Sequence, residues 1–236
     1  MSYDQILISD LEIMAGAKNY RAWMYRRLSP YIGQRVLEIG SGIGNFTKLL
    51  LDRDLVVATD NYQPCVEYLS SHLGEKLKAP PILLDAAGEI GSELKQHEFD
   101  TIVCLNVLEH IEDDLRALEQ MHALLVPRGR LVLLVPAFQF LYGSVDRSLG
   151  HYRRYTRKDL LPTMRRAGFL VERSFYMNVV GMAGWFWNNR IIKRTEESEK
   201  LIGIFDRYVA PVAEFTERLI PPPTGLSLIA IGRKER

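Results

Sequence analysis

The chain has 236 residues, of which 47% are hydrophobic and 25% charged, a balance typical of a folded globular protein rather than a disordered one. Thirty basic and 29 acidic side chains give a formal net charge of +1, so no overall positive field favours a nucleic-acid partner, and none is expected. Cys65 and Cys104 lie far apart in apolar segments and are expected to be reduced thiols. The longest apolar stretch, 179–187, is shorter than the roughly 20 residues that cross a bilayer, and the first ten residues lack the basic start of a signal peptide. These features predict a cytoplasmic protein.

Short apolar runs alternate with helical patterns between residues 34 and 135. The runs predict five strands, at 35–39, 55–59, 82–84, 100–105 and 130–135. Helices are predicted between them at 45–53, 64–73 and 113–125, the last stopped by a turn at 127–129. Because the strand runs are apolar almost throughout, they fit a parallel sheet covered on both faces by helices.

The pattern changes after residue 136. A polar and aromatic loop, 136–155, precedes a helix that begins at a capping box formed by Thr156 and Asp159 and stops at Gly168. A sixth strand is predicted at 169–176 and a seventh at 226–232, after three prolines. Between these strands, residues 177–220 form an insertion that is predicted to contain one or two helices.

The strongest local signal is a glycine-rich turn that follows the first strand. Gly40, Ser41 and Gly42 allow the backbone to turn tightly and to approach a ligand closely. Asp60 stands twenty residues after Gly40, at the end of the second strand, where an acid is placed to accept hydrogen bonds from two ribose hydroxyls. The pair predicts a ligand that contains adenosine, unless Asp60 serves only to cap a turn.

Two classes of adenosine ligand compete for this turn. A dinucleotide site has a third glycine or alanine where this chain has Asn45, so the chain departs from the pattern of nicotinamide-dependent oxidoreductases. Glu38, inside the first strand, disfavours a pyrophosphate but attracts the ammonium group of a methionine moiety. The charge therefore favours S-adenosylmethionine (SAM) over NAD.

Residues 34–135 resemble the class I SAM-dependent methyltransferases, because four motifs occur in the family's order. These are the turn from Glu38 to Gly44, the acidic end of the second strand, an acid after the third strand, and the fourth-strand segment 100–113. That last segment resembles the small-molecule branch that includes ubiquinone and menaquinone methyltransferases. The resemblance implies an α/β fold, a Rossmann-like three-layer sandwich with a seven-stranded, mostly parallel sheet whose last strand is antiparallel, plus a helical insertion between strands 6 and 7.

The resemblance also assigns residues to the donor. Asp60 and Asn61 hold the ribose, Asp85 and Ala86 contact the adenine, and Leu105, Asn106 and His110 lie at the methionine end. Tyr20 closes over the methionine carboxylate, unless it belongs to an amphipathic core helix. The alternatives for two others are that Asp85 lies in solvent and that His110 only packs at a helix start. The predicted donor-binding residues are Tyr20, Glu38, Gly40, Ser41, Gly42, Asn45, Phe46, Asp60, Asn61, Asp85, Ala86, Leu105, Asn106 and His110.

The methyl acceptor is expected to meet the loop after the fifth strand. Its GHYRRYT segment, 150–156, resembles that of uncharacterised bacterial members of this branch. His151 is the candidate for a base or an acceptor-positioning group, since its ordinary pKa is near neutrality, or else it only holds the loop together. Glu109 is expected to satisfy N–H groups at a helix start rather than to act as a base.

Tyrosines and arginines of the same loop complete the expected acceptor contacts. They are Tyr142, Tyr152, Arg153 and Arg154. The arginines offer forked hydrogen bonds to a phosphate or carboxylate, or are solvated charges at a helix start. No metal site is expected, because the five histidines form no group with ligand spacing along the chain.

The expected layout is a single domain over residues 1–236. Its parts are an N-terminal helical segment (1–33), the SAM-binding core (34–135), the acceptor-side loop, helix and strand (136–176), the helical insertion or cap (177–222) and the final strand (223–236). The insertion fits a lid over a hydrophobic acceptor, a homodimer interface, a helix on a membrane surface, or plain core packing.

The function predicted is methyl transfer from SAM, with S-adenosylhomocysteine (SAH) as product, to oxygen, nitrogen or carbon of a small acceptor, for which a hydrophobic or lipid-linked molecule is one option. The alternatives are a SAM- or SAH-binding protein without catalysis, which serves as a partner or regulator, and a nicotinamide-dependent oxidoreductase.

Overall fold

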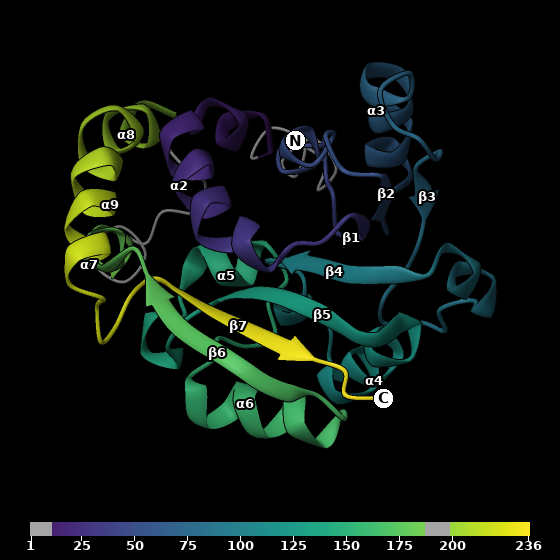
Figure 1. Ribbon diagram of the computed structural model, residues 1–236. Helices are drawn as coiled ribbons and strands as arrows, with labels where there is room; N and C mark the ends of the chain where they lie inside the picture. The colour runs from purple at the N-terminus through teal and green to yellow at the C-terminus, as the bar shows by residue number, and fades with distance from the viewer. Residues whose placement is uncertain (1–10, 187–198) are drawn as a thin grey trace.

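A computed structural model of the chain describes residues 11–186 and 199–236. It contains a seven-stranded sheet in the order β3-β2-β1-β4-β5-β7-β6 (Figure 1). The strands are β1 Arg35–Ile39, β2 Leu55–Asp60, β3 Ile82–Leu83, β4 Phe99–Leu105, β5 Leu125–Pro136, β6 Leu170–Met177 and β7 Ser227–Arg233. All seven were predicted from the sequence, with bounds that agree closely except at β5, which begins five residues earlier.

Strand directions confirm the predicted mostly parallel sheet. β1 pairs in parallel with β2 and β4, and β4 with β5, whereas β7 runs antiparallel to both β5 and β6. The order reverses at β1, because the chain builds outward from β1 to β3 and then returns to lay β4 on its other side. In open α/β sheets, ligands bind outside the carboxyl ends of the strands at such a reversal. The glycine turn and Asp60 follow β1 and β2 at this edge.

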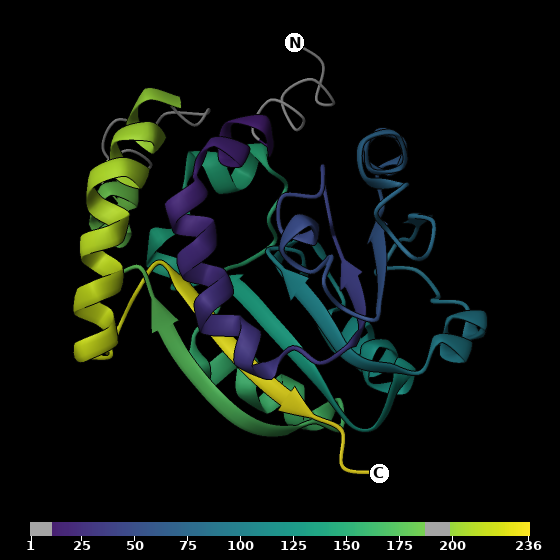
Figure 2. The same cartoon turned by 45° about the horizontal axis from the view of Figure 1, so that its top comes forward.

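Helices cover both faces of the sheet. On one face, α2 (Lys18–Leu28), α3 (Gln63–Leu73) and α9 (Ala210–Leu219) pack on a core cluster that includes Val36 and Val103. On the other, α4 (Asp114–Leu124) and α6 (Arg157–Arg166) pack on a cluster that includes Leu37 and Ile102. Figure 2 shows α2 and α9 side by side on the first face. Successive residues of β1 and β4 thus point into opposite cores, which explains their uninterrupted apolar runs.

Shorter elements complete the described chain. They are the helices α5 (Ser144–Ser148), α7 (Val179–Phe186) and α8 (Glu199–Ile204), the 3-10 helices η1 (Ser29–Tyr31), η2 (Thr47–Leu49), η3 (Ser92–His97), η4 (Leu108–His110) and η5 (Gln139–Leu141), and the π-helix η7 (Phe205–Val209). The capping box predicted at Thr156 and Asp159 opens α6. No helix in the described ranges is long and apolar enough to cross a membrane.

Two local predictions were wrong. The helix expected at 45–53 is a series of turns with one 3-10 turn, η2. Gly44 enters it with φ +80°, outside the helical region, and the aromatic Phe46 and β-branched Thr47 that follow are weak helix formers whose side chains are buried. The turn expected at 127–129 instead lies inside β5 as a bulge: Phe99 pairs with Leu125 but Thr101 with Arg130.

Buried carboxylates attach the insertion to the main body. Asp206 of η7 accepts hydrogen bonds from Asn19 N (3.1 Å) and Tyr20 N (2.8 Å), in the first turn of α2. Glu217 of α9 accepts from Asn178 N and Val179 N at 3.1 and 2.8 Å, where β6 passes into α7. Both acids therefore satisfy backbone donors that a helix leaves unpaired at its start. The part of the predicted insertion at 187–198 lies outside the described residues.

Candidate functional site

The glycine turn has a left-handed backbone conformation that residues with a Cβ atom rarely adopt. Gly40 and Gly42 have φ +75° and +54°, and a Cβ on Gly40 would stand 2.2 Å from Cγ2 of Val107. Gly42 N donates to Asp60 Oδ2 at 2.7 Å, and Tyr62 N donates to Asp60 Oδ1 at 3.0 Å. Each carboxylate oxygen retains a further lone pair. The turn, the end of β2 and the loop after β4 thus meet at one point.

Glu38 is a buried acid beneath this turn. It is 3% exposed, and its Oε2 has no hydrogen-bond partner among the described residues. Burial raises the pKa of Glu38 to about 7, with a smaller contribution from the charge of Asp60. Burial likewise raises the pKa of Asp60, which the N–H groups of Gly42 and Tyr62 partly offset. A cationic group bound here would lower the pKa of Glu38 and so favour its ionised form.

The N-terminal segment covers the turn. Asn45 Nδ2 donates to the carbonyl of Leu11 at 2.8 Å, and a Cβ on Gly42 would lie 3.1 Å from Cδ2 of Leu11. Leu11 was not predicted as a site residue, because only the fold brings it over the glycine turn. The side chain of Asn45, the residue that breaks the dinucleotide pattern, is therefore used to anchor this segment.

The remaining residues predicted for the donor divide into two groups. Ser41, Phe46 and Ala86 are buried, and Leu105 is half-buried at the end of β4. Asn106, which follows β4 with φ +54°, is exposed. Asn61, Asp85 and His110 are exposed, and Asp85 accepts from Ala87 N at 2.9 Å. Tyr20 packs edge-on against Trp23 and Phe205, in the core arrangement given as its alternative.

On the acceptor side, His151 is held by a buried ion pair. His151 Nδ1 lies 2.9 Å from Asp146 Oδ1, which also accepts from Arg154 Nε at 2.7 Å, while Gly143 N donates to Asp146 Oδ2 at 2.9 Å. Asp146 is fully buried, which by itself raises its pKa, but the bond from His151 and the charge of Arg154 bring the pKa below its ordinary value. The Asp146 carboxylate thus fixes the ring of His151 and leaves Nε2 for other contacts.

Glu109 and His110 lie beside that ring. The imidazoles of His110 and His151 meet edge to face with centroids 4.5 Å apart. Glu109 is fully buried in the first turn of η4, and neither carboxylate oxygen hydrogen-bonds to another described residue. Burial raises its pKa to about 8, although the N–H group of Glu109 itself, at this helix start, favours the charged carboxylate and so acts to lower the pKa. His110 keeps an exposed surface, but crowding by the surrounding protein and then the neighbouring imidazole lower its pKa to about 4.

The other residues predicted for the acceptor make contacts within the protein. Tyr142 Oη donates to the carbonyl of His151 at 2.7 Å, and Arg153 donates to Asp114 Oδ2 (3.1 Å) and to the carbonyl of Glu112. Arg154 is buried in its pair with Asp146. Among these four, Tyr152 is the most exposed. These contacts shape the loop and leave few free donors for an anionic acceptor group.

Sequence reasoning did not select Asp146 and Glu109 as site residues. Each stands close in sequence to a histidine that was selected, and Asp146 lies five residues before His151. An acid near a candidate base is a usable signal, but burial is what distinguishes Asp146 and Glu109 from exposed neighbours such as Asp113 and Glu112. Burial of a residue in a helix as short as η4 or α5 does not follow from sequence periodicity.

Comparison with known families and curated proteins gives a consistent result. A family model described as a methyltransferase domain matches residues 17–174. The ubiquinone biosynthesis O-methyltransferase of Xanthomonas euvesicatoria is 25% identical over 180 residues, which cover 70% of this chain and 73% of that protein. The probable polyketide synthase 41 of Dictyostelium discoideum is 29% identical over 135 residues, 47% of this chain, but the match spans only 5% of that protein's length.

Solved structures show the same fold. The N-methyltransferase NodS from Bradyrhizobium japonicum, in complex with SAH, matches with a TM-score of 0.58 and 16% identity, covering 92% of this chain and 86% of its own. A SAM-dependent methyltransferase from Archaeoglobus fulgidus matches with a TM-score of 0.57 and 18% identity, covering 91% of this chain and 92% of its own. At such low identity these matches describe the fold alone.

The buried acid under the glycine turn predicts a pH-dependent stability. Because the pKa of Glu38 in the folded, ligand-free protein is about 7, against an ordinary 4.5, folding favours the protonated form. The free energy of unfolding should therefore decline as pH rises from about 4.5 to about 7, with a Glu38 contribution on the order of 3 kcal/mol. Urea unfolding of Glu38→Gln at pH 5 and pH 8 should show a smaller decline than the wild type.

The matched control is Glu75→Gln, which changes an exposed acid just after α3. Its free energy of unfolding should decline between pH 5 and pH 8 by as much as that of the wild type. A Glu38→Gln decline that also equals that of the wild type would show that Glu38 is ionised in the folded protein.

Proposed function

The chain belongs to the methyltransferase-domain family, and on this premise we propose that it transfers a methyl group from SAM to oxygen, nitrogen or carbon of a small acceptor. The observation that carries the proposal is the meeting of Glu38, the glycine turn and Asp60 at the carboxyl ends of β1 and β2, where the strand order reverses. The family and the fold support methyl transfer as the class of reaction. The acceptor is inferred from the residues around the loop after β5.

The residues present fit the donor. Asp60 stands at the tip of β2 with lone pairs left for two ribose hydroxyls. The unpartnered Oε2 of Glu38 fits the ammonium of the methionine moiety, directly or through water. The side chain of Val107 lies against Gly40 and that of Leu11 lies against Gly42, so both offer apolar contacts beside the turn. A nicotinamide dinucleotide fits less well, because its pyrophosphate would face Glu38.

In methyl transfer the methyl group passes directly between the two substrates, so the protein need not form a covalent bond to it. The acceptor atom forms a bond to the methyl carbon while the carbon–sulfur bond breaks, and the electron pair of that bond stays on sulfur to give SAH. Alignment of the two reactants supplies much of the rate. Where the acceptor is a hydroxyl, its proton must leave, and His151, oriented by Asp146, is the group we propose for proton acceptance or acceptor positioning.

The insertion supports a hydrophobic or lipid-linked acceptor. Trp185 of α7 lies on the guanidinium of Arg154, whose carbon is 4.7 Å from the ring centroid, so the insertion contacts the ion pair that orients His151. The outward face of η7 and α9 is apolar, with Tyr208, Val212 and Phe215 each more than 60% exposed. The spacing of these side chains places them on one side of a helix.

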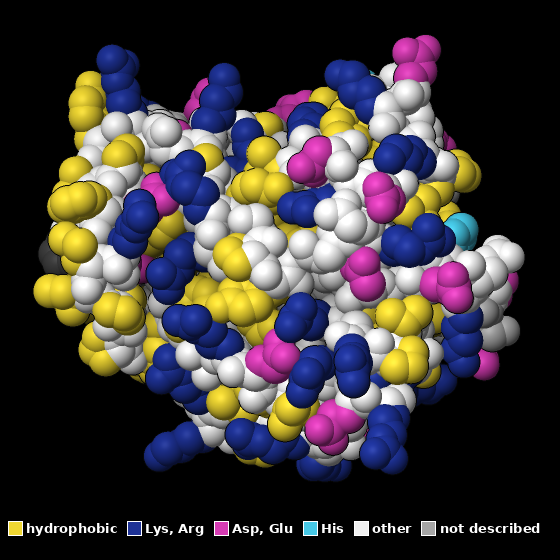
Figure 3. All heavy atoms as spheres, in the orientation of Figure 1, with side chains coloured by type: hydrophobic (Ala, Val, Ile, Leu, Met, Phe, Trp, Pro, Cys, Tyr) yellow, Lys and Arg dark blue, Asp and Glu magenta, His cyan; other side chains and the backbone are white. Residues whose placement is uncertain are grey.

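We propose that this face rests on a membrane surface that carries the acceptor. Figure 3 shows its hydrophobic side chains along the left edge of the molecule, with Lys and Arg among them. Exposed Lys200, Arg207 and Arg218 outnumber the exposed acid Glu199, since Glu214 is paired with Arg26. An apolar helix face flanked by basic residues binds an anionic lipid surface. A homodimer through the same face is the competing arrangement.

Calorimetry with SAH tests the donor site. The wild type should bind SAH and not NAD, and Asp60→Ala should bind SAH at least about tenfold more weakly, because it loses charge-assisted hydrogen bonds to the ribose. Asp52→Ala, which removes an exposed acid, should bind like the wild type. Circular dichroism shows whether each variant is folded.

Failure of the folded wild type to bind SAH, or equal binding by Asp60→Ala, would contradict the proposal. Binding of SAH with no methyl transfer to any acceptor tested would favour the alternative of a non-catalytic SAH-binding partner.

Sedimentation with lipid vesicles tests the membrane face. The protein should bind vesicles that contain an anionic lipid more strongly than vesicles of phosphatidylcholine alone, and salt should weaken the binding. The double variant Phe215→Ser, Leu219→Ser should lose it, whereas Phe140→Ser, an exposed aromatic away from α9, should retain it. Binding unchanged in the double variant would contradict the proposal, as would a dimer in solution that the double variant converts to monomer.

A further inference from the structure

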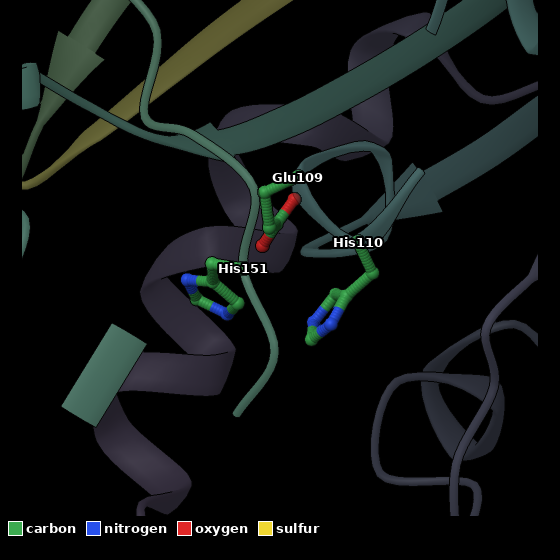
Figure 4. A group of neighbouring side chains, drawn as sticks. All are labelled: Glu109, His110 and His151. Carbon is green, nitrogen blue, oxygen red and sulfur yellow. The ribbon is translucent and has the colours of Figure 1, made fainter. Parts of the chain in front are cut away.

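Three side chains with metal-binding atoms lie together at the acceptor side. Glu109 and His110 come from η4, after β4, and His151 comes from the loop after α5. One ligand atom of each lies within 4.8 Å of one atom from each of the others. Figure 4 shows the three side chains next to one another, with the carboxylate of Glu109 above the two imidazole rings in this view. We call this group the Glu–His–His cluster.

The carboxylate of Glu109 is fully buried, and neither of its oxygens hydrogen-bonds to another described residue. A buried acid without a partner is costly to ionise, so a chain that keeps one ordinarily uses it to hold a cation or a proton. Arg154, the buried cation of this region, donates instead to Asp146 and to the carbonyl of Ala137.

His151 already has the supporting contact that metal-binding histidines use. Such a histidine binds the ion through one ring nitrogen and gives the other to a carboxylate, which fixes the ring. Nδ1 of His151 lies 2.9 Å from Asp146 Oδ1, and Asp146 is held in turn by Arg154 and by the N–H of Gly143. The contact between Nδ1 and Asp146 therefore fixes the orientation of the ring that carries Nε2.

We propose that Glu109, His110 and His151 bind one divalent transition-metal ion, for which Zn²⁺ is the reference. Two imidazole nitrogens and one carboxylate oxygen suit Zn²⁺, Fe²⁺ or Co²⁺, whereas Mg²⁺ and Ca²⁺ prefer oxygen ligands alone. Bonds of about 2.1 Å in a tetrahedral site place ligand atoms about 3.4 Å apart, so the side chains close by about an ångström on binding. His110 reaches solvent on one side, so we expect its side chain to make most of that movement.

This inference deepens the proposed function and rests on it for the ion's role. Three protein ligands would leave a fourth position for an acceptor oxygen, as catalytic zinc sites do. An ion there acts as a Lewis acid on an acceptor oxygen and promotes loss of its proton. In the metal-loaded protein His151 is then a ligand that positions the acceptor, the second of the two roles predicted for it.

Spacing along the chain does not reveal the cluster. The helices α4 and α5 and the strand β5 lie between His110 and His151 in the sequence. The fold brings the two histidines together because the chain returns after β5, where Tyr152 N donates to the carbonyl of Glu109 at 2.8 Å. That backbone bond ties the two halves of the cluster regardless of whether an ion is bound.

Zinc calorimetry on chelator-treated protein without a histidine tag tests the proposal. The wild type should bind one equivalent of Zn²⁺, and Co²⁺ should give visible absorption bands. Glu109→Gln, His110→Ala and His151→Ala should each bind at least about tenfold more weakly and lose the Co²⁺ bands. The control His72→Ala, on the outer side of α3, should bind like the wild type.

Absence of stoichiometric Zn²⁺ binding by the folded wild type would overturn the proposal, and so would unchanged binding in His110→Ala and His151→Ala together. Calorimetry with SAH on the same samples separates this result from the proposed function. Metal binding without SAH binding would leave the site but remove its catalytic role, whereas SAH binding without metal binding would reject the site alone.

Discussion

Gly40 and Gly42 hold left-handed backbone conformations that bring the end of β1, Asp60 and the loop after β4 together. Without side chains at these positions, β1 can end directly beneath Val107 and present Gly42 N to Asp60. A Cβ at Gly40 would collide with Val107, so the loop that carries Glu109 and His110 would have to move away. The turn therefore sets the distance between the proposed donor site and the acceptor side. This is a backbone requirement, and it holds whatever the ligand is.

A second group of interactions organises the acceptor side. Asp146 is buried with Arg154 and accepts from Gly143 N, so its charge is compensated by a pair and by hydrogen bonds, as a buried carboxylate requires. The same carboxylate orients His151, and Trp185 of the insertion lies on Arg154. The position of one histidine ring thus depends on the loop after β5 and on α7. This connection gives the insertion a reason to be apolar on its inner side that is independent of its outer face.

Much of the fold follows from the sequence. Strands that are buried on both faces have continuous apolar sequences, and the capping box of Thr156 and Asp159 depends only on residues close together in the chain. The place of Asp60 at the end of the second strand also follows from the order of the motifs. The predictions failed where tertiary contacts override local patterns: residues 127–129 became a bulge within β5, and Phe46 and Thr47 were buried in turns rather than in a helix. The partners of His151 were missed for a related reason, since burial of Asp146 and the meeting of His110 with His151 arise only when distant segments come together.

A crystal structure of the complex with SAH would show directly where the donor lies relative to these side chains. We expect the ribose hydroxyls to lie within hydrogen-bonding distance of the Asp60 carboxylate and the amino group of the methionine moiety to face Glu38. The sulfur should then face the side on which Glu109, His110 and His151 meet. SAH bound elsewhere on the sheet, or bound with its ribose away from Asp60, would show that the glycine turn and Asp60 do not form the donor site.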